Sequence, residues 1–575
     1  MTLSTPSQAE HRKYISYLEQ LQAGDQASAA SGLRQLHCLR PDWLEPLLAL
    51  VELALSNSSI IEAAERQHLL QKLQTPPQDA DPRSLFLLAK DRIVCADIEQ
   101  AIHFLQKACE IQPNFALGNQ QLAALLLQKE RWAEAEEILR AQLKSFPDQA
   151  HLLTNLSVAL LRQNRLEDAL TLAERALSQA EPDQLASVHV NLGTILQELG
   201  RRQEAQKHYK KTLSLTPEHI NARLNLGVIA LQDKNFTTAE NYFRETLALQ
   251  PNDARASVNL AGLLLLQDRA EEGWAYYERR VHEESTILAQ PNQLPRWQGE
   301  PLQGSLVLVH EQGLGDTFQF IRYAKLLQTQ GLRCHFRGPQ KLHGLIQDSG
   351  LVFSCHTPNE ALPRDASAWI ALMSLAPLLG ASVQQPLTSG EPYFNVDQAR
   401  VERWQSLLGP RKGLRLALHW QGNPDHEFTI SRGRSLCLDE LSPLLSIPGV
   451  EWISLQKGPG SEQAEQGTFA DCWHSQQPSI NAAWDFEDAA AILKCCDGLV
   501  SSDSGLAHLA GAIGTRVWLM LPWLAEWRWG LKGSKCTWYQ NHSLLRQQIE
   551  NDWDAPIQSL LQEIKMAQNL DQHIV

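Results

Sequence analysis

The sequence predicts two kinds of architecture in one chain, an α-solenoid of paired helices followed by an α/β region of two lobes. Three observations carry this prediction. Small residues and prolines recur at intervals of about 34 residues through the first half. Short apolar runs alternate with amphipathic stretches after residue 304. Two of these runs lead into glycine-containing turns that also carry an aspartate.

The repeat in the first half is set by small residues. They lie at intervals of 34, 34, 36, 34 and 34 residues, and each is preceded twelve positions earlier by another small residue. Two short antiparallel helices can approach closely only where small side chains face each other, and the proline that follows ends the second helix of each unit. The positions are Ala101, Ala135, Ala169, Ala205, Ala239 and Gly273. The pattern predicts a stack of helix pairs, which is a binding surface rather than a catalyst.

Changes in pattern divide the chain into five predicted parts. Residues 1–80 form an N-terminal helical region with one degenerate repeat, residues 81–284 form the regular repeats, and residues 285–304 form a proline-containing linker. Residues 305–395 form the first lobe, and residues 396–575 form the second lobe with a C-terminal helix.

Aliphatic and β-branched runs mark the predicted strands of the second half. They are residues 305–310, 332–336, 369–373, 414–419, 450–455, 498–501 and 516–521. Helices are predicted at residues 317–330, 396–408, 487–495 and 504–513. This alternation predicts parallel sheets covered by helices, arranged as two Rossmann-like lobes with a ligand-binding cleft between them.

The composition excludes several classes of protein. A formal charge of −14 opposes binding to nucleic acid, which needs clustered Lys and Arg. No apolar run approaches the ~20 residues of a membrane span, and the first residues lack a secretion signal. The ten cysteines are scattered and form no Cys-x-x-Cys pair, which suits reduced thiols better than disulfides or a zinc site. We therefore expect a cytoplasmic protein without a membrane span.

The first chemical motif follows the strand at residues 305–310. Gly313 and Gly315 permit a tight turn and close approach of a ligand to the backbone. Asp316, at the mouth of the cleft, could accept the proton of an attacking hydroxyl. Asp316 also fits an N-cap, with Gln319 completing a capping box, and a helix N-terminus weakens a carboxylate as a base. The residues by themselves favour the cap.

The second motif runs from Asp503 to His508, directly after the strand at residues 498–501. Asp503 is the predicted helix cap, and the backbone N–H groups after it are predicted to point into the cleft. Those N–H groups belong to Ser504, Gly505, Leu506 and Ala507. An unobstructed helix N-terminus is a good site for a diphosphate. His508 either touches a phosphate or sugar, or packs against a neighbouring strand.

The third motif begins at the end of the first strand of the second lobe. It contains Trp420 and Asn423 and continues as a polar loop to Arg432 and Arg434. The two arginines and Lys457 are candidates to neutralise phosphate charge, although a single arginine is more often a solvated surface residue.

Together these features resemble two known families. The repeats resemble the tetratricopeptide repeat. Residues of about 300–555 resemble the heptosyltransferase-like glycosyltransferases of the family 9 type, which have the GT-B fold. The matching elements are Gly-Leu-Gly-Asp316-Thr-x-Gln-Phe-x-Arg-Tyr, Trp420-x-Gly-Asn-Pro, Arg434-Ser435, Asp503-Ser-Gly-x-Ala-His508-Leu-Ala-Gly and Leu521-Pro-Trp-Leu-Ala-Glu-Trp527-Arg-Trp529.

The resemblance implies an inverting transfer of sugar from a nucleotide-diphosphate donor, without a metal ion or other cofactor. It assigns the general base to Asp316, the acceptor side to the first lobe and the nucleotide sugar to the second. The predicted donor-binding residues are Gly313, Gly315, Trp420, Asn423, Arg434, Lys457, Asp503, Ser504, Gly505, Leu506, Ala507 and His508. Ser504 stands where the family often has threonine, a change that keeps the hydroxyl.

Matched asparagines in the repeats predict how an acceptor is held. They are Asn155, Asn191, Asn225 and Asn259. The resemblance implies that these positions face a concave groove, where primary amides can bond to an extended peptide backbone. The alternative is that each asparagine bonds locally. We expect a protein or peptide acceptor on the repeats and a nucleotide sugar on the lobes.

The sequence is also compatible with two other functions. One is a repeat scaffold whose α/β half binds a nucleotide sugar, or nothing, without turnover. The other is a transferase directed at lipopolysaccharide or another glycan, which leaves the solenoid without a role. Five tryptophans in the second lobe either line the nucleotide or acceptor path or pack in the core. They are Trp518, Trp523, Trp527, Trp529 and Trp538.

Overall fold

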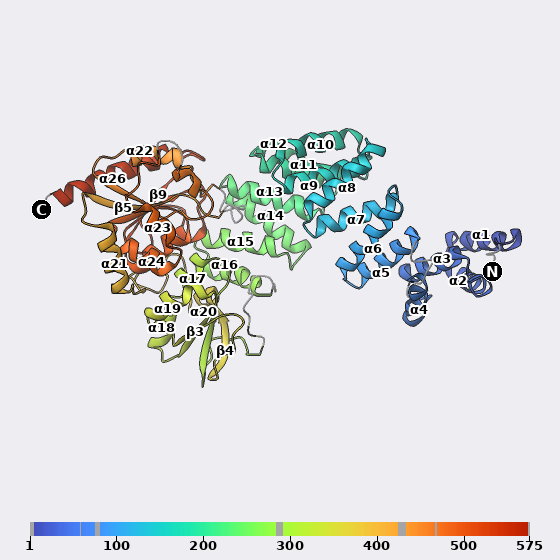
Figure 1. The fold of residues 1–575 in the computed structure, drawn as a ribbon, viewed down its shortest axis with the longest axis horizontal. Helices are drawn as coiled ribbons and strands as arrows, with labels where there is room; N and C mark the ends of the chain where they lie inside the picture. The colour runs from blue at the N-terminus through green and yellow to red at the C-terminus, as the bar shows by residue number, and fades with distance from the viewer. Residues whose placement is uncertain are drawn as a thin grey trace. The chain divides into compact units, whose positions relative to one another are not determined.

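The fold comes from a computed structural model of the 575-residue chain, shown in Figure 1. The described residues are 5–57, 59–74, 81–282, 291, 293–423, 433–465 and 469–572. Of the candidate residues, Arg432 lies outside them. The chain divides into two compact units, Met1–Ala222 and Arg223–Val575. Each unit is described here by itself.

The first unit is built from paired helices, as the repeat predicts. Their bounds are α1 Gln8–Gln22, α2 Gln26–Leu39, α3 Leu44–Ser56, α4 Ala63–Leu73, α5 Pro82–Val94, α6 Ile98–Ile111, α7 Ala116–Gln128, α8 Trp132–Ser145, α9 Ala150–Arg162, α10 Leu166–Gln179, α11 Leu185–Glu198 and α12 Arg202–Leu215. The small residues are fully buried at helix contacts, among them Ala101 and Ala135. A Cβ built on Gly193 would lie 2.5 Å from the Tyr209 ring, so the pair α11–α12 requires glycine there.

The turn inside each repeat contains a residue with a left-handed backbone conformation that its residue type does not predict. One residue per turn has a positive φ, between 56° and 77°. These residues are Ala96, Glu130, Asn164, Gly200, Lys234 and Asp268. Only one of them is glycine, so the position has to be recognised from its spacing rather than from its residue type.

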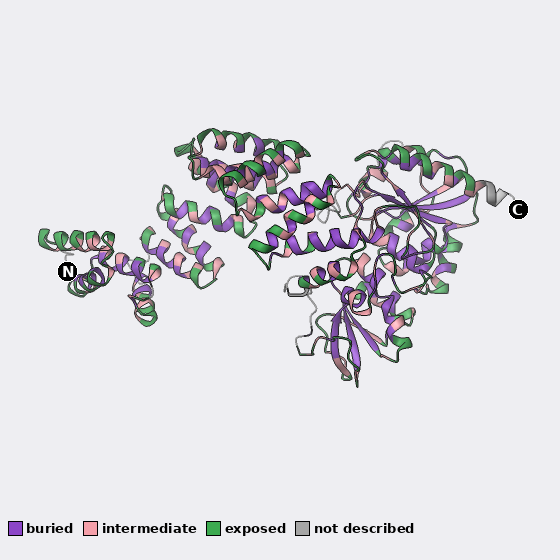
Figure 2. Ribbon diagram, turned by 180° about the vertical axis from the view of Figure 1, so that it is seen from behind, coloured by how far each residue is buried: buried purple, intermediate pink, exposed green. Residues whose placement is uncertain are grey.

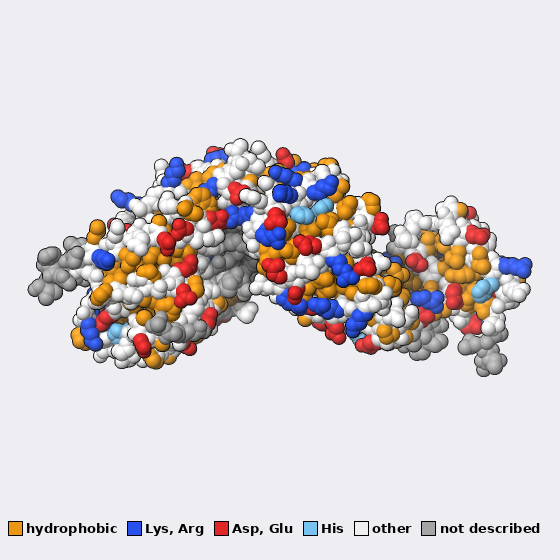
Figure 3. Space-filling view, turned by 90° about the horizontal axis from the view of Figure 1, so that it is seen from above, with side chains coloured by type: hydrophobic (Ala, Val, Ile, Leu, Met, Phe, Trp, Pro, Cys, Tyr) orange, Lys and Arg blue, Asp and Glu red, His pale blue; other side chains and the backbone are white. Residues whose placement is uncertain are grey.

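Ion pairs connect successive repeats on the outside of the helices. Arg165 lies 2.9 Å from Glu136 in the preceding repeat of the first unit. The same relation recurs in the second unit, where Arg269 lies 2.7 Å from Glu240. Figure 3 shows that Lys and Arg side chains lie close to Asp and Glu over much of the face in view. Exposed pairs of this kind stabilise a fold only weakly, so the buried small residues determine the stacking.

The last repeats belong to the second unit. Their helices are α13 Ile220–Gln232, α14 Phe236–Leu249, α15 Ala254–Leu266 and α16 Ala270–Tyr277, followed by the short 3-10 helix η2 Glu278–His282. One buried apolar cluster runs from Leu224 through these helices into both α/β lobes. Residues are buried on most sides of α15, as Figure 2 shows, because it contacts α14, α16 and the 3-10 helix η10 Trp527–Trp529 of the second lobe. The final repeat therefore shares a core with the lobes.

The first lobe contains a parallel four-stranded sheet in the order β3-β2-β1-β4. The strands are β1 Ser305–Val309, β2 Cys334–Arg337, β3 Ser354–His356 and β4 Ala366–Ala371. The helices are α17 Leu314–Phe320, α18 Tyr323–Thr329, α19 His343–Asp348 and α20 Leu375–Leu379, with 3-10 turns η3 Gln340–Leu342 and η4 Leu372–Ser374. All five residues of β1 are buried, as a strand covered on both faces requires.

The second lobe contains a parallel five-stranded sheet in the order β6-β5-β7-β8-β9. The strands are β5 Leu414–His419, β6 Val450–Ser454, β7 Gly498–Ser502, β8 Val517–Leu521 and β9 His542–Arg546. The helices are α21 Gln398–Leu408, α22 Ser442–Leu445, α23 Gln477–Ala482, α24 Phe486–Lys494, α25 Gly505–Ile513 and α26 Asp554–Gln572, with 3-10 turns η7 Leu438–Leu441 and η8 Ser461–Glu465. The predicted solenoid followed by parallel α/β lobes is confirmed.

Two details of the predicted elements were wrong. The helix expected over residues 317–330 is two helices, α17 and α18, that meet at Arg322. The Arg322 guanidinium is buried and bonds the carbonyls of Gln319 at 2.7 Å and Trp538 at 2.6 Å. Strands β3 and β9 were also missed, because β3 has three half-buried residues and β9 begins with His and ends with Arg.

Candidate active site between the two lobes

The first turns of α17 and α25 meet where the two lobes face each other. Helix α17 follows β1 and helix α25 follows β7, so both start at the carboxyl ends of parallel strands. A Cβ built on Gly315 would lie 3.0 Å from Cδ2 of His508 and 3.2 Å from Cα of Gly505. Glycine at position 315 is therefore what allows this close approach. The structure thus brings together the first two motifs predicted from the sequence.

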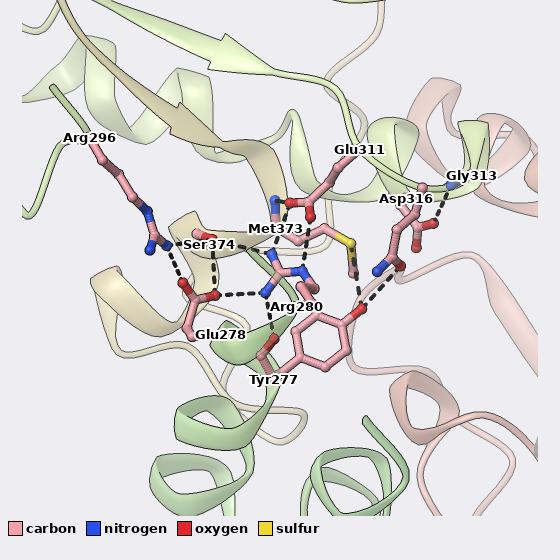
Figure 4. A network of polar contacts seen from close by, with 10 residues as sticks. Tyr277, Glu278, Arg280, Arg296, Glu311, Gly313, Asp316, Met373 and Ser374 are labelled. Atoms are coloured by element: carbon pink, nitrogen blue, oxygen red, sulfur yellow. Dashed lines mark hydrogen bonds and ion pairs between the residues drawn. The ribbon is translucent and has the colours of Figure 1, made fainter. Parts of the chain in front are cut away.

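Asp316 is the third residue of α17 rather than its N-cap. The N-cap is Gly313, and Oδ2 of Asp316 accepts the Gly313 N–H at 2.9 Å. The predicted cap position was therefore wrong by three residues, although the side chain does bond the start of its helix. Figure 4 shows the Asp316 carboxylate turned toward Gly313. The other oxygen, Oδ1, accepts a hydrogen bond from Nη1 of Arg528 at 2.8 Å.

Arg528 lies at the centre of the polar groups between the lobes. It follows β8, its side chain is 7 % exposed, and it also donates to Oε1 of Gln319 at 2.9 Å and forms an ion pair with Glu526. Burial disfavours the charged form of Arg528, but the carboxylates of Glu526, Asp316 and Asp503 raise its pKa well above the usual range. One cation thus compensates three carboxylates in a poorly hydrated space.

Two of these carboxyl groups are shifted toward their protonated forms. Burial raises the pKa of Asp503, and the charge of Arg528 opposes that shift only in part. Burial likewise raises the pKa of Glu526 against the effect of Arg528. Perturbed carboxyl groups that gather in a cleft are typical of functional sites. The sequence did not predict Arg528 and Glu526 as site residues, although both lie in the Leu521–Trp529 element that carries part of the family resemblance.

The start of α25 differs from the prediction in one respect. Its N-cap is Ser504, not Asp503, and the Ser504 hydroxyl lies 3.0 Å from that of Ser501. The amides of Ala507 and His508 bond the Ser504 carbonyl at 3.2 and 3.5 Å. The first amides of a helix have no intrahelical acceptor, and here they belong to Gly505 and Leu506. An anion can approach a helix start of this kind closely, and the predicted diphosphate contacts stay a prediction.

His508 is packed between aromatic rings. It is 3 % exposed, its Nδ1 lies 3.0 Å from the Tyr539 hydroxyl, and its ring stacks on Trp529 with centroids 5.1 Å apart. Burial, with Arg528 nearby, lowers its pKa well below the usual range, so the ring is neutral. The alternative of a packed histidine therefore describes its environment in this structure. Contact with a phosphate or sugar stays a prediction.

The third motif is split between core and surface. The Trp420 ring is fully buried and stacks on Trp473, with centroids 6.0 Å apart. The ring therefore packs in the core, and donor binding by Trp420 stays a prediction. The Asn423 carbonyl accepts from Nη2 of Arg434 at 3.4 Å. Donor binding by Asn423 and Arg434 stays a prediction.

Lys457 lies at the carboxyl end of β6, in the second lobe. Its Nζ donates to the Ile480 carbonyl at 2.7 Å and lies 5.5 Å from the centroid of the exposed Trp484 ring. Burial lowers the pKa of Lys457 to about 8. A lysine whose charge is poorly solvated gains much from an anionic ligand, so Lys457 remains a candidate for the donor phosphates.

The asparagines of the repeats do not all have the same surroundings. Asn191 is 8 % exposed, and its Nδ2 donates to the Ser157 hydroxyl of the preceding repeat at 2.6 Å. This is the local bonding that was the alternative to a peptide contact. Asn155 is half-buried in the first unit, and Asn225 and Asn259 are half-buried in the second. Acceptor binding by the four asparagines stays a prediction.

Most of the tryptophan cluster is core. Trp518, Trp527, Trp529 and Trp538 are buried, whereas Trp523 is half-buried. The ring of Trp523 is covered by Lys234 of the α13–α14 turn, whose Nζ lies 3.2 Å from its centroid. Both residues line a cavity of about 240 Å³, together with Lys532 and Arg546. Packing therefore explains four of the five rings.

Within the described ranges, no helix is long and apolar enough to cross a membrane. Among the same residues, no three His, Cys, Asp or Glu side chains are grouped so that they could hold a metal ion.

Comparisons with known families agree with this architecture. Residues 184–252, and separately residues 121–184 and 234–283, match models of the tetratricopeptide repeat. Residues 454–518 match the model of glycosyltransferase family 9 (heptosyltransferase), and this segment runs from the last residue of β6 through β7 and α25 to the start of β8. The chain thus joins tetratricopeptide repeats to a domain of the glycosyltransferase family 9 type.

The individual proteins to which the chain is similar share only a low sequence identity with it. The chain is 26 % identical over 413 residues to Protein FlbA of Caulobacter vibrioides (strain ATCC 19089 / CIP 103742 / CB 15), covering 66 % of this chain and 67 % of that protein. Among solved structures, it is similar to MamA at 20 % identity and a TM-score of 0.25, covering 29 % of this chain and 97 % of MamA. It is also similar to Pseudomonas aeruginosa pilF at 22 % identity and a TM-score of 0.31, covering 35 % of this chain and 91 % of that one.

Proposed function

We propose that the chain transfers a sugar from a nucleotide-diphosphate donor to a protein or peptide acceptor that the repeats recruit. The Asp316–Arg528 pair carries the proposal, because it lies where the first turns of α17 and α25 meet, and α25 belongs to the segment that matches glycosyltransferase family 9. A carboxylate, a buried cation and a helix N-terminus are the groups that a proton transfer and a departing diphosphate require.

In the proposed reaction, a hydroxyl of the acceptor attacks the anomeric carbon of the donor sugar. The new carbon–oxygen bond forms on the face opposite the diphosphate while the bond to the phosphate oxygen breaks, so the configuration inverts. Asp316 takes the hydroxyl proton, and the nucleoside diphosphate leaves with the bonding electrons. A carboxylate has about four lone-pair sites. Gly313 and Arg528 use two of those on Asp316, which leaves acceptor capacity for the substrate proton.

The charge of the leaving diphosphate is the second requirement. We assign the binding of this negative charge to the backbone amides at the start of α25 and to two cations, Lys457 and Arg434. In this proposal the protein supplies the neutralising groups, and the transfer is independent of a metal ion. Addition of a chelator should therefore leave the rate unchanged. Loss of activity in the chelator, with recovery on adding Mg²⁺ or Mn²⁺, would contradict this part.

The acceptor side rests on the repeats. Tetratricopeptide repeats are binding surfaces, and a carbohydrate-directed transferase has no evident use for one of this length. Asn155 is half-buried in the first unit, and Asn225 and Asn259 are half-buried in the second. We assign to these amides the bonds to an extended peptide. This supports a protein acceptor over a lipopolysaccharide or other glycan acceptor.

The test compares Asp316→Asn with Asp348→Asn, an exposed aspartate at the end of α19 in the same lobe. Release of nucleoside diphosphate from a panel of UDP-, GDP-, ADP- and dTDP-sugars is measured with and without co-expressed proteins, whose masses are then recorded. We expect Asp316→Asn to lose at least about 100-fold in rate. Its affinity for the nucleoside diphosphate and the activity of Asp348→Asn should stay unchanged.

Other outcomes separate the alternatives. Full activity of Asp316→Asn removes the assignment of the base. Absence of release with every donor, while a nucleotide sugar still binds, favours a scaffold. Transfer to a glycan but to no co-expressed protein favours the glycan-directed transferase.

A further inference from the structure

The turn that carries Asp316 contains an unfavourable backbone conformation. Gln312, between β1 and α17, has a φ of +55° although it is not glycine. Residues other than glycine adopt this left-handed region less readily, so contacts with neighbouring side chains help to hold Gln312 there. Gln312 precedes Gly313, whose N–H is bonded by Asp316. The contacts that hold Gln312 therefore bear on the position of the Asp316 carboxylate.

The side chain that reaches Gln312 comes from the last repeat. The hydroxyl of Tyr277, the final residue of α16, donates to Oε1 of Gln312 at 3.2 Å, and it lies 3.6 Å from Sδ of Met373. Tyr277 is 5 % exposed. Figure 4 shows its hydroxyl directed at the turn that leads to Asp316.

A buried ion pair fixes the residue before Gln312. Nε and Nη2 of Arg280 each lie 2.9 Å from the carboxylate oxygens of Glu311. The two side chains are 1 % and 0 % exposed. Glu311 also accepts the Met373 N–H at 2.8 Å, and Arg280 donates to the Tyr277 carbonyl at 3.0 Å. A bidentate pair with these further bonds fixes both position and orientation.

Helix α16 also contacts η10, the 3-10 helix that contains Arg528. The Trp274 ring packs edge to face on Trp527, with centroids 5.3 Å apart, and its Nε1 donates to the Ala381 carbonyl at 2.7 Å. Trp527 directly precedes Arg528. Helix α16 thus contacts the turn that precedes Asp316 and the 3-10 helix η10 that contains Arg528.

We propose that Tyr277 and Arg280, which lie in the last repeat, are positioning residues for Asp316. They hold the Glu311–Gly313 turn in the conformation that places the Asp316 carboxylate beside Arg528. The final repeat is then an integral part of the active site as well as the end of the binding array. This inference rests on the proposed transfer reaction for its catalytic consequence, but the conformational part stands without it.

The first test uses adjacent tyrosines as a matched pair. Tyr277→Phe removes only the hydroxyl that bonds Gln312. Tyr276→Phe removes a hydroxyl that lies 3.3 Å from Arg244, on the side of the neighbouring repeat. We expect kcat to fall about fivefold in Tyr277→Phe, the effect of one ordinary hydrogen bond. The KM for the donor and the thermal midpoint should stay close to those of the native chain, and Tyr276→Phe should be unchanged in all three.

The second test does not need activity. Amide hydrogen exchange of the peptide spanning Glu311–Thr317 is measured in the full-length chain and in both phenylalanine variants. If Tyr277 holds the turn, exchange at the Gly313 amide is faster in Tyr277→Phe and unchanged in Tyr276→Phe. Equal exchange in both variants overturns the inference, whether or not the native chain transfers a sugar. If exchange is faster in Tyr277→Phe but the native chain transfers no sugar, the inference stands and the proposed function is contradicted.

The arginine has a matched neighbour as well. Arg280→Lys keeps the charge but loses the bidentate geometry, whereas Arg279→Lys alters a side chain that bonds the Pro251 carbonyl at 3.2 Å. We expect faster exchange of the same turn in Arg280→Lys only. The same rate in Arg280→Lys and Arg279→Lys would show that Arg280 does not position the turn.

Discussion

Oδ1 of Asp316 lies 2.8 Å from Nη1 of Arg528, and this contact joins residues 212 positions apart in the sequence. One belongs to the first lobe and the other to the second. Because Arg528 also compensates Glu526 and Asp503, the pair is the centre of a buried charge cluster rather than an isolated ion pair. The cluster leads to several predictions.

Removing Arg528 alone should destabilise the fold more than removing Arg528 together with Glu526. Arg528→Gln leaves buried carboxylates without a counter-charge, and we expect a loss of about 3–5 kcal/mol in the free energy of unfolding. Glu526→Gln in the same chain removes one uncompensated carboxylate and should recover part of that loss. Urea denaturation of the two variants measures both values. A double variant as unstable as the single one would show that Arg528 and Glu526 are not coupled.

Buried histidines should make the protein sensitive to acid. Burial, with Arg322 nearby, lowers the pKa of His542 to about 3, so the folded chain keeps this ring neutral where the unfolded chain protonates it. Its contribution is complete above the unfolded pKa of about 6.5 and is lost progressively as the pH falls toward 3. We expect His542→Phe to reduce the slope of the unfolding free energy between pH 4 and 6 by about 1.4 kcal/mol per pH unit.

The measurement is urea denaturation at several pH values. His103→Phe, at an exposed position on α6, is the control and should retain the native slope. An unchanged slope in His542→Phe would show that this ring is not kept neutral by folding.

Binding of the donor should depend on the charge of Lys457. Its pKa of about 8 means that the free lysine is mostly charged at pH 7 and mostly neutral at pH 9, so affinity for a nucleoside diphosphate should fall as the pH rises through 8. Lys457→Met should weaken binding about tenfold at pH 7 and abolish this pH dependence. Isothermal titration with the nucleoside diphosphate that binds the native chain checks both results. Lys494→Met, at the exposed end of α24, should bind as the native chain does.

The asparagines offer a test of acceptor binding. If the amides form a ladder, replacing Asn155, Asn191, Asn225 and Asn259 together with Ala should weaken acceptor binding at least about tenfold without affecting donor hydrolysis. Asn191→Ala alone should lower the thermal midpoint, because it leaves the buried Ser157 hydroxyl without this donor. Unchanged acceptor affinity in the fourfold variant would exclude the ladder.

The sequence predicted the architecture because its signals are local. Small residues at a fixed interval set the helix pairs, and apolar runs such as residues 305–310 set the buried strands. The glycine turns of the first two motifs were also visible, and Gly315 does lie against Gly505. The residues by themselves favoured a helix cap at Asp316, and only the family resemblance assigned the general base to it.

The contacts of the site were decided by the tertiary structure. Arg528 belongs to the site because it contacts Asp316 in the other lobe, and Tyr277 belongs to it because its hydroxyl contacts Gln312. No periodicity records such pairs, because each joins elements that only folding brings together. The break at Arg322 has the same origin, because its buried guanidinium bonds the carbonyl of Trp538, which is 216 positions away in the sequence. What the sequence determined by itself is the order and type of elements, and what only the structure decided is which charged groups share a buried space.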